Sequence, residues 1–68
     1  MFIEVGYWKK DPKDPVTHLE FFEVDKMPDK AAIVRALNYL GRDFDEATIT
    51  ISRTNRSPDS GIRYRKLP

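Results

Sequence analysis

One stretch of helical periodicity constrains this fold more than any other feature of the chain. Apolar side chains recur at i, i+3, i+4 and i+7 spacing at Ile33, Ala36, Leu37 and Leu40, the pattern of a helix with one apolar face. We expect the helix to run from about Pro28 to Leu40, because proline is tolerated at the first helical position. A single helix covers only one face of a sheet. Any sheet in this chain is therefore expected to keep an open face.

Alternation of apolar and polar residues predicts four strands around this helix. They fall at residues 1–8, 16–24, 48–52 and 61–65. A polar loop joins the first two strands, and a cluster of turn residues at 53–61 joins the last two. The chain of 68 residues has room for one domain. The sequence therefore predicts a single small α+β domain over residues 1–68, of order ββαββ, with a four-stranded, mainly antiparallel sheet and the helix packed on one face.

The hairpin followed by a helix in the first half of the chain resembles the start of a β-grasp domain such as ubiquitin. This resemblance is one of element order and hydrophobic pattern. It implies a β-grasp-like order for the sheet. The sequence has no diglycine tail, so the resemblance does not imply conjugation chemistry.

Strand phase assigns each side chain to one face of the sheet. Under the helix we expect Ile3, Val5, Tyr7, Leu19, Phe21, Ile49, Ile51, Ile62 and Tyr64. On the open face we expect Phe2, Trp8, Thr48, Thr50, Ser52, Arg63 and Arg65. The second strand contains a conflict, because Phe22 and Val24 have the opposite phase to Leu19 and Phe21. A bulge near Phe21 would turn Val24 toward the core, and without a bulge Phe22 joins the open face.

Basic residues are concentrated in the C-terminal part of a chain whose net charge is +1. From residue 47 onward a single acidic residue, Asp59, accompanies Arg53, Arg56, Arg63, Arg65 and Lys66. Phase then predicts one partner-binding surface, with Arg53 and Arg56 at the rim of a centre formed by Phe2, Trp8, Arg63 and Arg65. Local packing with no further role is one interpretation of this surface. A protein interface, self-association included, is another, since aromatic residues and arginine are enriched at binding hot spots.

Residues that carry catalysis or bind metals are sparse. His18 is the only histidine and there is no cysteine, so a metal site would need carboxylates to complete it. Asp11 and Asp14 lie in a proline-containing loop without the glycine of an EF-hand, and we expect them to shape the turn. We predict no catalytic residues, no cofactor and no metal site, and therefore no enzyme.

The function predicted from the sequence is that of a small non-enzymatic binding or regulatory protein. It would act by occupying a surface on a macromolecular partner, most directly a protein, as inhibitors encoded by phages or accessory bacterial elements do. The alternative is a module for single-stranded nucleic acid or RNA, with bases on the aromatics and phosphates on the arginines. No small-molecule substrate is evident. The absence of cysteine and of any apolar run near the ~20 residues that span a bilayer predicts a soluble, cytoplasmic protein.

Overall fold

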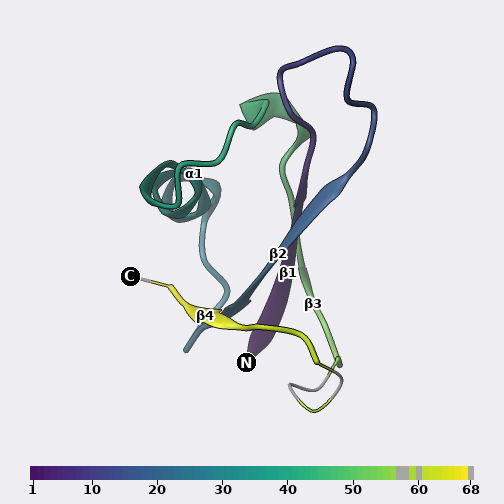
Figure 1. Ribbon diagram of the computed structural model, residues 1–68. Coiled ribbons are helices and arrows are strands. Elements are labelled where there is room, and N and C mark those ends of the chain that lie inside the picture. The colour runs from purple at the N-terminus through teal and green to yellow at the C-terminus, as the bar shows by residue number, and fades with distance from the viewer. Residues whose placement is uncertain (57–58, 60, 68) are drawn as a thin grey trace.

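A computed structural model describes residues 1–56, 59 and 61–67 of the chain. One helix lies against one face of a four-stranded sheet (Figure 1). The elements in chain order are β1 (Phe2–Tyr7), β2 (His18–Glu23), α1 (Lys30–Tyr39), the 3-10 turn η1 (Glu46–Thr48), β3 (Thr50–Arg53) and β4 (Arg65–Lys66). The predicted α+β class and the two strands on either side of the helix are confirmed. Residues 57, 58 and 60 of the predicted turn segment lie outside the described residues. None of the described helices is long and apolar enough to cross a membrane.

The sheet is mixed, with the strand order β3-β1-β2-β4. β1 pairs antiparallel with β2 and with β3, whereas β4 pairs parallel with β2. β3 and β4 therefore lie at opposite edges, and the chain between them has to cross one end of the sheet. This crossing uses residues that were predicted as strand 61–65, so β4 is short. The likeness to ubiquitin ends with the hairpin and helix, because the first and last strands are not neighbours here.

The helix begins two residues later than predicted. Asp29 is its N-cap, and the Asp29 side chain accepts a hydrogen bond of 2.8 Å from the Ala32 backbone N–H. This bond satisfies one of the N–H groups that have no partner within the first turn. Pro28 lies outside the helix, so its predicted place at the first helical position is wrong.

A glycine directly follows the C-cap of the helix, as the sequence predicts. Gly41 follows the C-cap residue Leu40 and has a φ of 71°, a conformation that glycine adopts without steric cost. The Gly41 N–H donates to the Asn38 carbonyl and the Arg42 N–H to the Leu37 carbonyl, each at 3.0 Å. These two bonds form a Schellman motif and direct the chain back toward the sheet.

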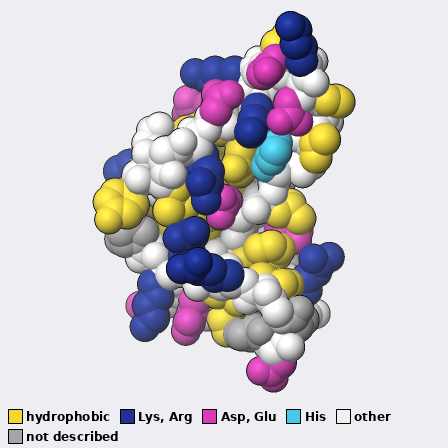
Figure 2. Space-filling view, in the orientation of Figure 1, with side chains coloured by type: hydrophobic (Ala, Val, Ile, Leu, Met, Phe, Trp, Pro, Cys, Tyr) yellow, Lys and Arg dark blue, Asp and Glu magenta, His cyan; other side chains and the backbone are white. Residues whose placement is uncertain are grey.

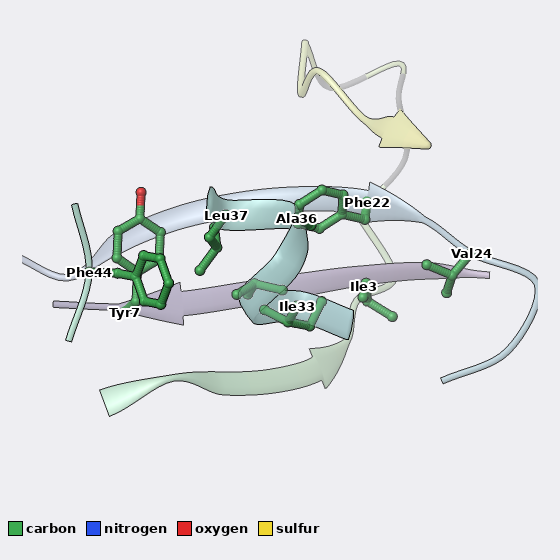
Figure 3. Close-up of a cluster of buried hydrophobic side chains, with 9 residues drawn as sticks. Ile3, Tyr7, Phe22, Val24, Ile33, Ala36, Leu37 and Phe44 are labelled. Carbon is green, nitrogen blue, oxygen red and sulfur yellow. The ribbon is translucent and has the colours of Figure 1, made fainter. Parts of the chain in front are cut away.

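The core lies between α1 and the sheet (Figure 3). Figure 3 shows the helix side chains over the sheet, with Tyr7 and Phe44 at one end and Val24 at the other. Phe44 therefore closes one end of the core. The buried apolar residues are Ile3, Val5, Tyr7, Phe22, Val24, Ile33, Ala36, Leu37 and Phe44.

The second strand has the phase opposite to the one predicted. Pairing of β1 with β2 is continuous from Phe2–Glu23 to Tyr7–His18, without a bulge between these residues. Phe22 lies opposite the buried Ile3 and is 1% exposed. The prediction that Leu19 and Phe21 face the helix is therefore wrong. Both alternatives for the second strand are wrong as well, because there is no bulge and Phe22 nevertheless lies in the core and not on the open face.

Polar residues on the helix side of β2 explain why this phase is tolerated. His18 and Glu20 share the phase of Phe22, and each has a polar partner from outside the strand. His18 Nε2 lies 3.2 Å from Asp14 Oδ2, and Arg42 Nε donates to Glu20 Oε1 at 2.6 Å. These pairs compensate both side chains for the water that they lose.

Candidate binding face of the sheet

The face of the sheet that α1 leaves uncovered carries an apolar patch around the single tryptophan. Trp8 is 53% exposed and Leu19 is 45% exposed. In Figure 2 hydrophobic side chains gather on the side of the sheet away from α1. We call this region the Trp8 patch and define it by Gly6, Trp8, Thr17, Leu19, Thr48 and Thr50.

Three hydrogen bonds hold Trp8 in place. Its backbone N–H donates to Thr48 Oγ1 at 2.9 Å, and its indole Nε1 donates to Thr17 Oγ1 at 3.0 Å. Its carbonyl accepts from the Asp45 N–H at 2.7 Å. The predicted place of Trp8 on the open face is confirmed, and the indole is fixed there although half of it is exposed to solvent.

The turn η1 supplies one of these bonds. The Asp45 side chain accepts from the Ala47 N–H at 3.1 Å, and the Thr48 hydroxyl donates to the Asp45 carbonyl at 2.7 Å. The Thr48 side chain is thereby oriented to accept from Trp8. Because Thr48 belongs to this turn, β3 begins at Thr50, and the prediction of a strand from Thr48 is wrong for its first two residues.

Gly6 forms the floor of a hollow beside the indole. The hollow has a volume of about 380 Å³ and is lined by Gly6, Tyr7, Trp8, Thr17, Thr48 and Thr50. A Cβ atom at Gly6 would lie 2.8 Å from Thr50 Oγ1, so only glycine fits here without displacement of its neighbour. Sequence reasoning did not single out Gly6. A glycine inside an alternating strand is nevertheless a signal of close approach.

A second aromatic group covers the other end of the open face. The Tyr64 ring lies 4.5 Å from the Phe2 ring and 5.7 Å from the Phe21 ring, measured between centroids. The Tyr64 hydroxyl donates to the Arg56 carbonyl. Tyr64 was predicted under the helix, and that prediction is wrong because the crossing segment brings it to the open face. Phe2 is therefore half-buried.

The structure does not bring the predicted arginines together on this face. Arg65 aligns with the buried Phe22 across a parallel pair, so its side chain lies on the helix side of the sheet. Arg53 aligns with Ile3 and has the same phase. The prediction that Arg65 shares a face with Trp8 is wrong, because the phase of β4 is set by its pairing with β2.

The remaining charges of the open face are acidic on the central strands. Arg56 and Arg63 are exposed on the segment that carries Tyr64. In the sheet, Glu4 is the partner of Phe21 and Glu23 is the partner of Phe2. The open face therefore combines aromatic rings and hydroxyl groups with carboxylates rather than with a band of arginines.

A polar cluster on the helix side was not anticipated from the sequence. His18 stacks on Tyr7 with 5.7 Å between the ring centroids. The pKa of the Asp14 carboxyl is lowered, first by the hydrogen bond from the Val16 backbone N–H and then by contacts with His18 and Lys9. Burial raises the pKa of Tyr7, and the negative charge of Glu20 raises it further. These contacts join the β1–β2 loop to the sheet.

The loop carboxylates shape the β1–β2 connection, as predicted. Asp11 Oδ1 accepts from the Lys13 N–H at 2.9 Å and Asp14 Oδ1 accepts from the Val16 N–H at 3.2 Å. Over residues 1–56, 59 and 61–67, no three His, Asp or Glu side chains form a group that could hold a metal ion.

Comparison with protein-family models, curated proteins and solved structures found no match to this chain. Its function has to be inferred from its own surface.

Proposed function

We propose that this protein is a small non-enzymatic module that binds a protein partner through the Trp8 patch. The observation that carries the proposal is an exposed indole beside a hollow whose floor is a glycine. The indole bonds to Thr17, and two further hydrogen bonds hold the backbone of Trp8. Tryptophan is among the residues enriched at binding hot spots. A side chain that is already held by a hydrogen bond loses less conformational entropy when a partner covers it.

The patch suits a protein side chain in its size and chemistry. The hollow of about 380 Å³ can receive one apolar side chain against the indole. The hydroxyl groups of Thr17 and Thr50 border it and can bond to a partner backbone. The protein would act in the cytoplasm as a regulator or inhibitor that occupies a partner surface, in keeping with a chain without cysteine.

A nucleic-acid partner is the less favoured class. Phosphate backbones are bound by clusters of lysine and arginine. The central strands of the open face instead carry Glu4 and Glu23, and Arg65 lies on the helix side. A single-stranded nucleic acid that crossed this face would lie next to carboxylates.

Pull-down from a native cell lysate tests the proposal, with and without nuclease. The bait would be the wild type, Trp8→Ala, or the matched control Tyr39→Ala. Tyr39 is 82% exposed and lies on α1, away from the patch. We expect one protein to be retained by the wild type and by Tyr39→Ala in both nuclease arms, and to be lost with Trp8→Ala.

The retained protein would then be purified and titrated against each variant at several salt concentrations. Binding through the patch should persist at moderate salt, because apolar anchors are not screened. Binding to a single-stranded nucleic acid should weaken as salt rises. In a plot of the logarithm of the binding constant against the logarithm of the salt concentration, the slope should be about −0.7 per phosphate contacted. Trp8 emission should be red-shifted and quenched by acrylamide in the free protein, and shielded in the complex. Loss of the retained species on nuclease treatment, or equal capture by Trp8→Ala, would contradict the proposal.

A further inference from the structure

A groove runs between α1 and β4, on the helix side of the sheet. Figure 2 shows lysine and arginine side chains between these two elements. The groove has a narrow part of about 280 Å³ and a wider part of about 650 Å³, which meet at Lys66. Its helix wall is formed by Ala32, Arg35, Ala36 and Tyr39, at the i, i+3, i+4, i+7 spacing of one helix face.

The narrow part has an apolar floor and a cationic rim. Phe22 and Ala36 form the floor with Leu40, and Arg65 forms the rim. Lys66 also lines this part, but it is the register partner of Glu23 and its side chain has the phase of the open face. Tyr39, whose ring is the most exposed of the large hydrophobic side chains, lies at the opening. Among the described residues no acidic side chain lines this part. An apolar floor beside a cationic rim suits a ligand in which an apolar side chain has a carboxylate next to it.

The cations of the groove are available to a ligand. Within the described residues the ion pairs involve Lys9, His18 and Arg42, and none involves Arg35, Arg65 or Lys66. Charge-assisted hydrogen bonds to carboxylates are the strongest contacts that such side chains form. The groove thus holds two cations, Arg35 and Arg65, that form no ion pair within the described residues and lie near an apolar floor.

The wider part has the opposite character. It is lined by the acidic residues Asp25 and Asp29 as well as by Lys26 and Arg35. A long polyphosphate chain following the groove would meet these carboxylates and be repelled. A short peptide segment with its acidic residues at one end would avoid this repulsion. The charge distribution therefore favours a peptide over a nucleic acid.

β4 offers a backbone edge to such a peptide. It is the last strand in the order β3-β1-β2-β4, so over Arg65–Lys66 one side of its backbone faces no other strand of the sheet. Extended peptides commonly add to an open edge of this kind, with alternate side chains directed into neighbouring pockets.

We propose that the groove between α1 and β4 binds an extended acidic peptide segment. One apolar side chain enters the hollow over Phe22, and neighbouring carboxylates pair with Arg65 and Arg35. This site is separate from the Trp8 patch and does not depend on the function proposed for that patch.

Fluorescence anisotropy with synthetic peptides tests the proposal on the full chain. The probe is a fluorescein-labelled peptide of alternating glutamate and leucine, and its neutral analogue has glutamine in place of glutamate. We expect the glutamate peptide to bind with a Kd lower by about tenfold or more, since a single charge-assisted contact is sufficient for that ratio. Unlabelled oligodeoxythymidine should displace it poorly.

Charge reversal provides the matched comparison. The double variant Arg35→Glu with Arg65→Glu should lose the preference for the glutamate peptide. The double variant Arg53→Glu with Arg56→Glu carries the same charge change outside the groove and should keep it. Circular dichroism would verify that both are folded.

Tyr39→Ala, on the exposed helix surface, is a second test that leaves the sheet unchanged, and it should weaken binding measurably. Equal affinity for the two peptides, no binding of either, or equal behaviour of the two charge-reversal variants would overturn the proposal. So would unchanged binding by Tyr39→Ala, or displacement of the peptide by oligodeoxythymidine. Trp8→Ala should bind the peptide as the wild type does, which separates this result from a failure of the Trp8 patch.

Discussion

Phe21 and Phe22 are neighbours in the chain but lie on opposite faces of the sheet, which makes them a matched pair for testing the register of β2. Phe22 is 1% exposed and packs in the core under α1. Phe21 is half-buried on the open face, where its ring meets Tyr64. Truncation of each to alanine removes the same atoms from two different environments.

The expected losses of stability differ severalfold. Phe22→Ala should lower the free energy of unfolding by about 3–5 kcal/mol, the usual loss when a buried phenylalanine is truncated. Phe21→Ala should cost roughly 1–2 kcal/mol, from partial burial at about 25 cal/mol per Å² and from an aromatic pair of about 0.5–1.5 kcal/mol. A chain of this size has about 3–5 kcal/mol of stability in total. Phe22→Ala should therefore be largely unfolded at room temperature, while Phe21→Ala stays folded.

Urea denaturation followed by far-UV circular dichroism measures both values by linear extrapolation. Phe22→Leu retains part of the side-chain volume and gives a folded baseline if Phe22→Ala has none. Equal losses, or a larger loss for Phe21→Ala, would mean that β2 is shifted by one residue and that Leu19 and Phe21 face the helix.

Further predictions concern the open face, the loop and the helix. Gly6→Ala should lower the melting temperature because its Cβ would lie 2.8 Å from Thr50 Oγ1, and Thr50→Ala should restore part of the loss; strictly additive effects in a double-mutant cycle would contradict this contact. The lowered pKa of Asp14 means that its charge stabilises the fold above the unfolded value of about 3.9 and that this contribution is lost as pH falls through the lower folded value. Asp14→Asn should therefore melt below the wild type at pH 7, with the difference closing in the acid range, and a constant difference across pH would argue against it. Leu37→Ala should cost about 2–5 kcal/mol, and a near-wild-type melt would show that Leu37 is not a core residue.

The helix could be located from local pattern because its signals lie within a few residues of one another. The spacing of Ile33, Ala36 and Leu37 gives the buried face, and Gly41 gives the end. The start was misplaced because Pro28 and Asp29 both suit a helix N-terminus, and the hydrogen bond of the Asp29 side chain decided between them. The open position of Trp8 also followed from the phase of β1, because Ile3, Val5 and Tyr7 all face the core and Trp8 has the opposite phase.

The candidate sites were less accessible to such reasoning. The hollow over Gly6 depends on Thr17, Thr48 and Thr50, which lie far from it in sequence and meet it only through the pairing of three strands. The groove depends on β4 lying beside β2, which places Arg65 over Phe22. The parallel pairing of β4 with β2 joins segments that are far apart in the sequence, and the alternation of residues 61–65 does not specify it.

The phase of β2 shows where local pattern ends and tertiary structure begins. Alternation divides the strand into two sets of side chains, but both sets contain two large apolar residues. Burial of Phe22 and Val24 requires His18 and Glu20 to lie on the helix side as well. That arrangement is stable because Asp14 from the loop and Arg42 from beyond the helix end supply polar partners for His18 and Glu20. Those partners are brought to the strand only when the chain has folded, so the sequence defines the two faces of β2 and the packing of loop and helix decides which of them is buried.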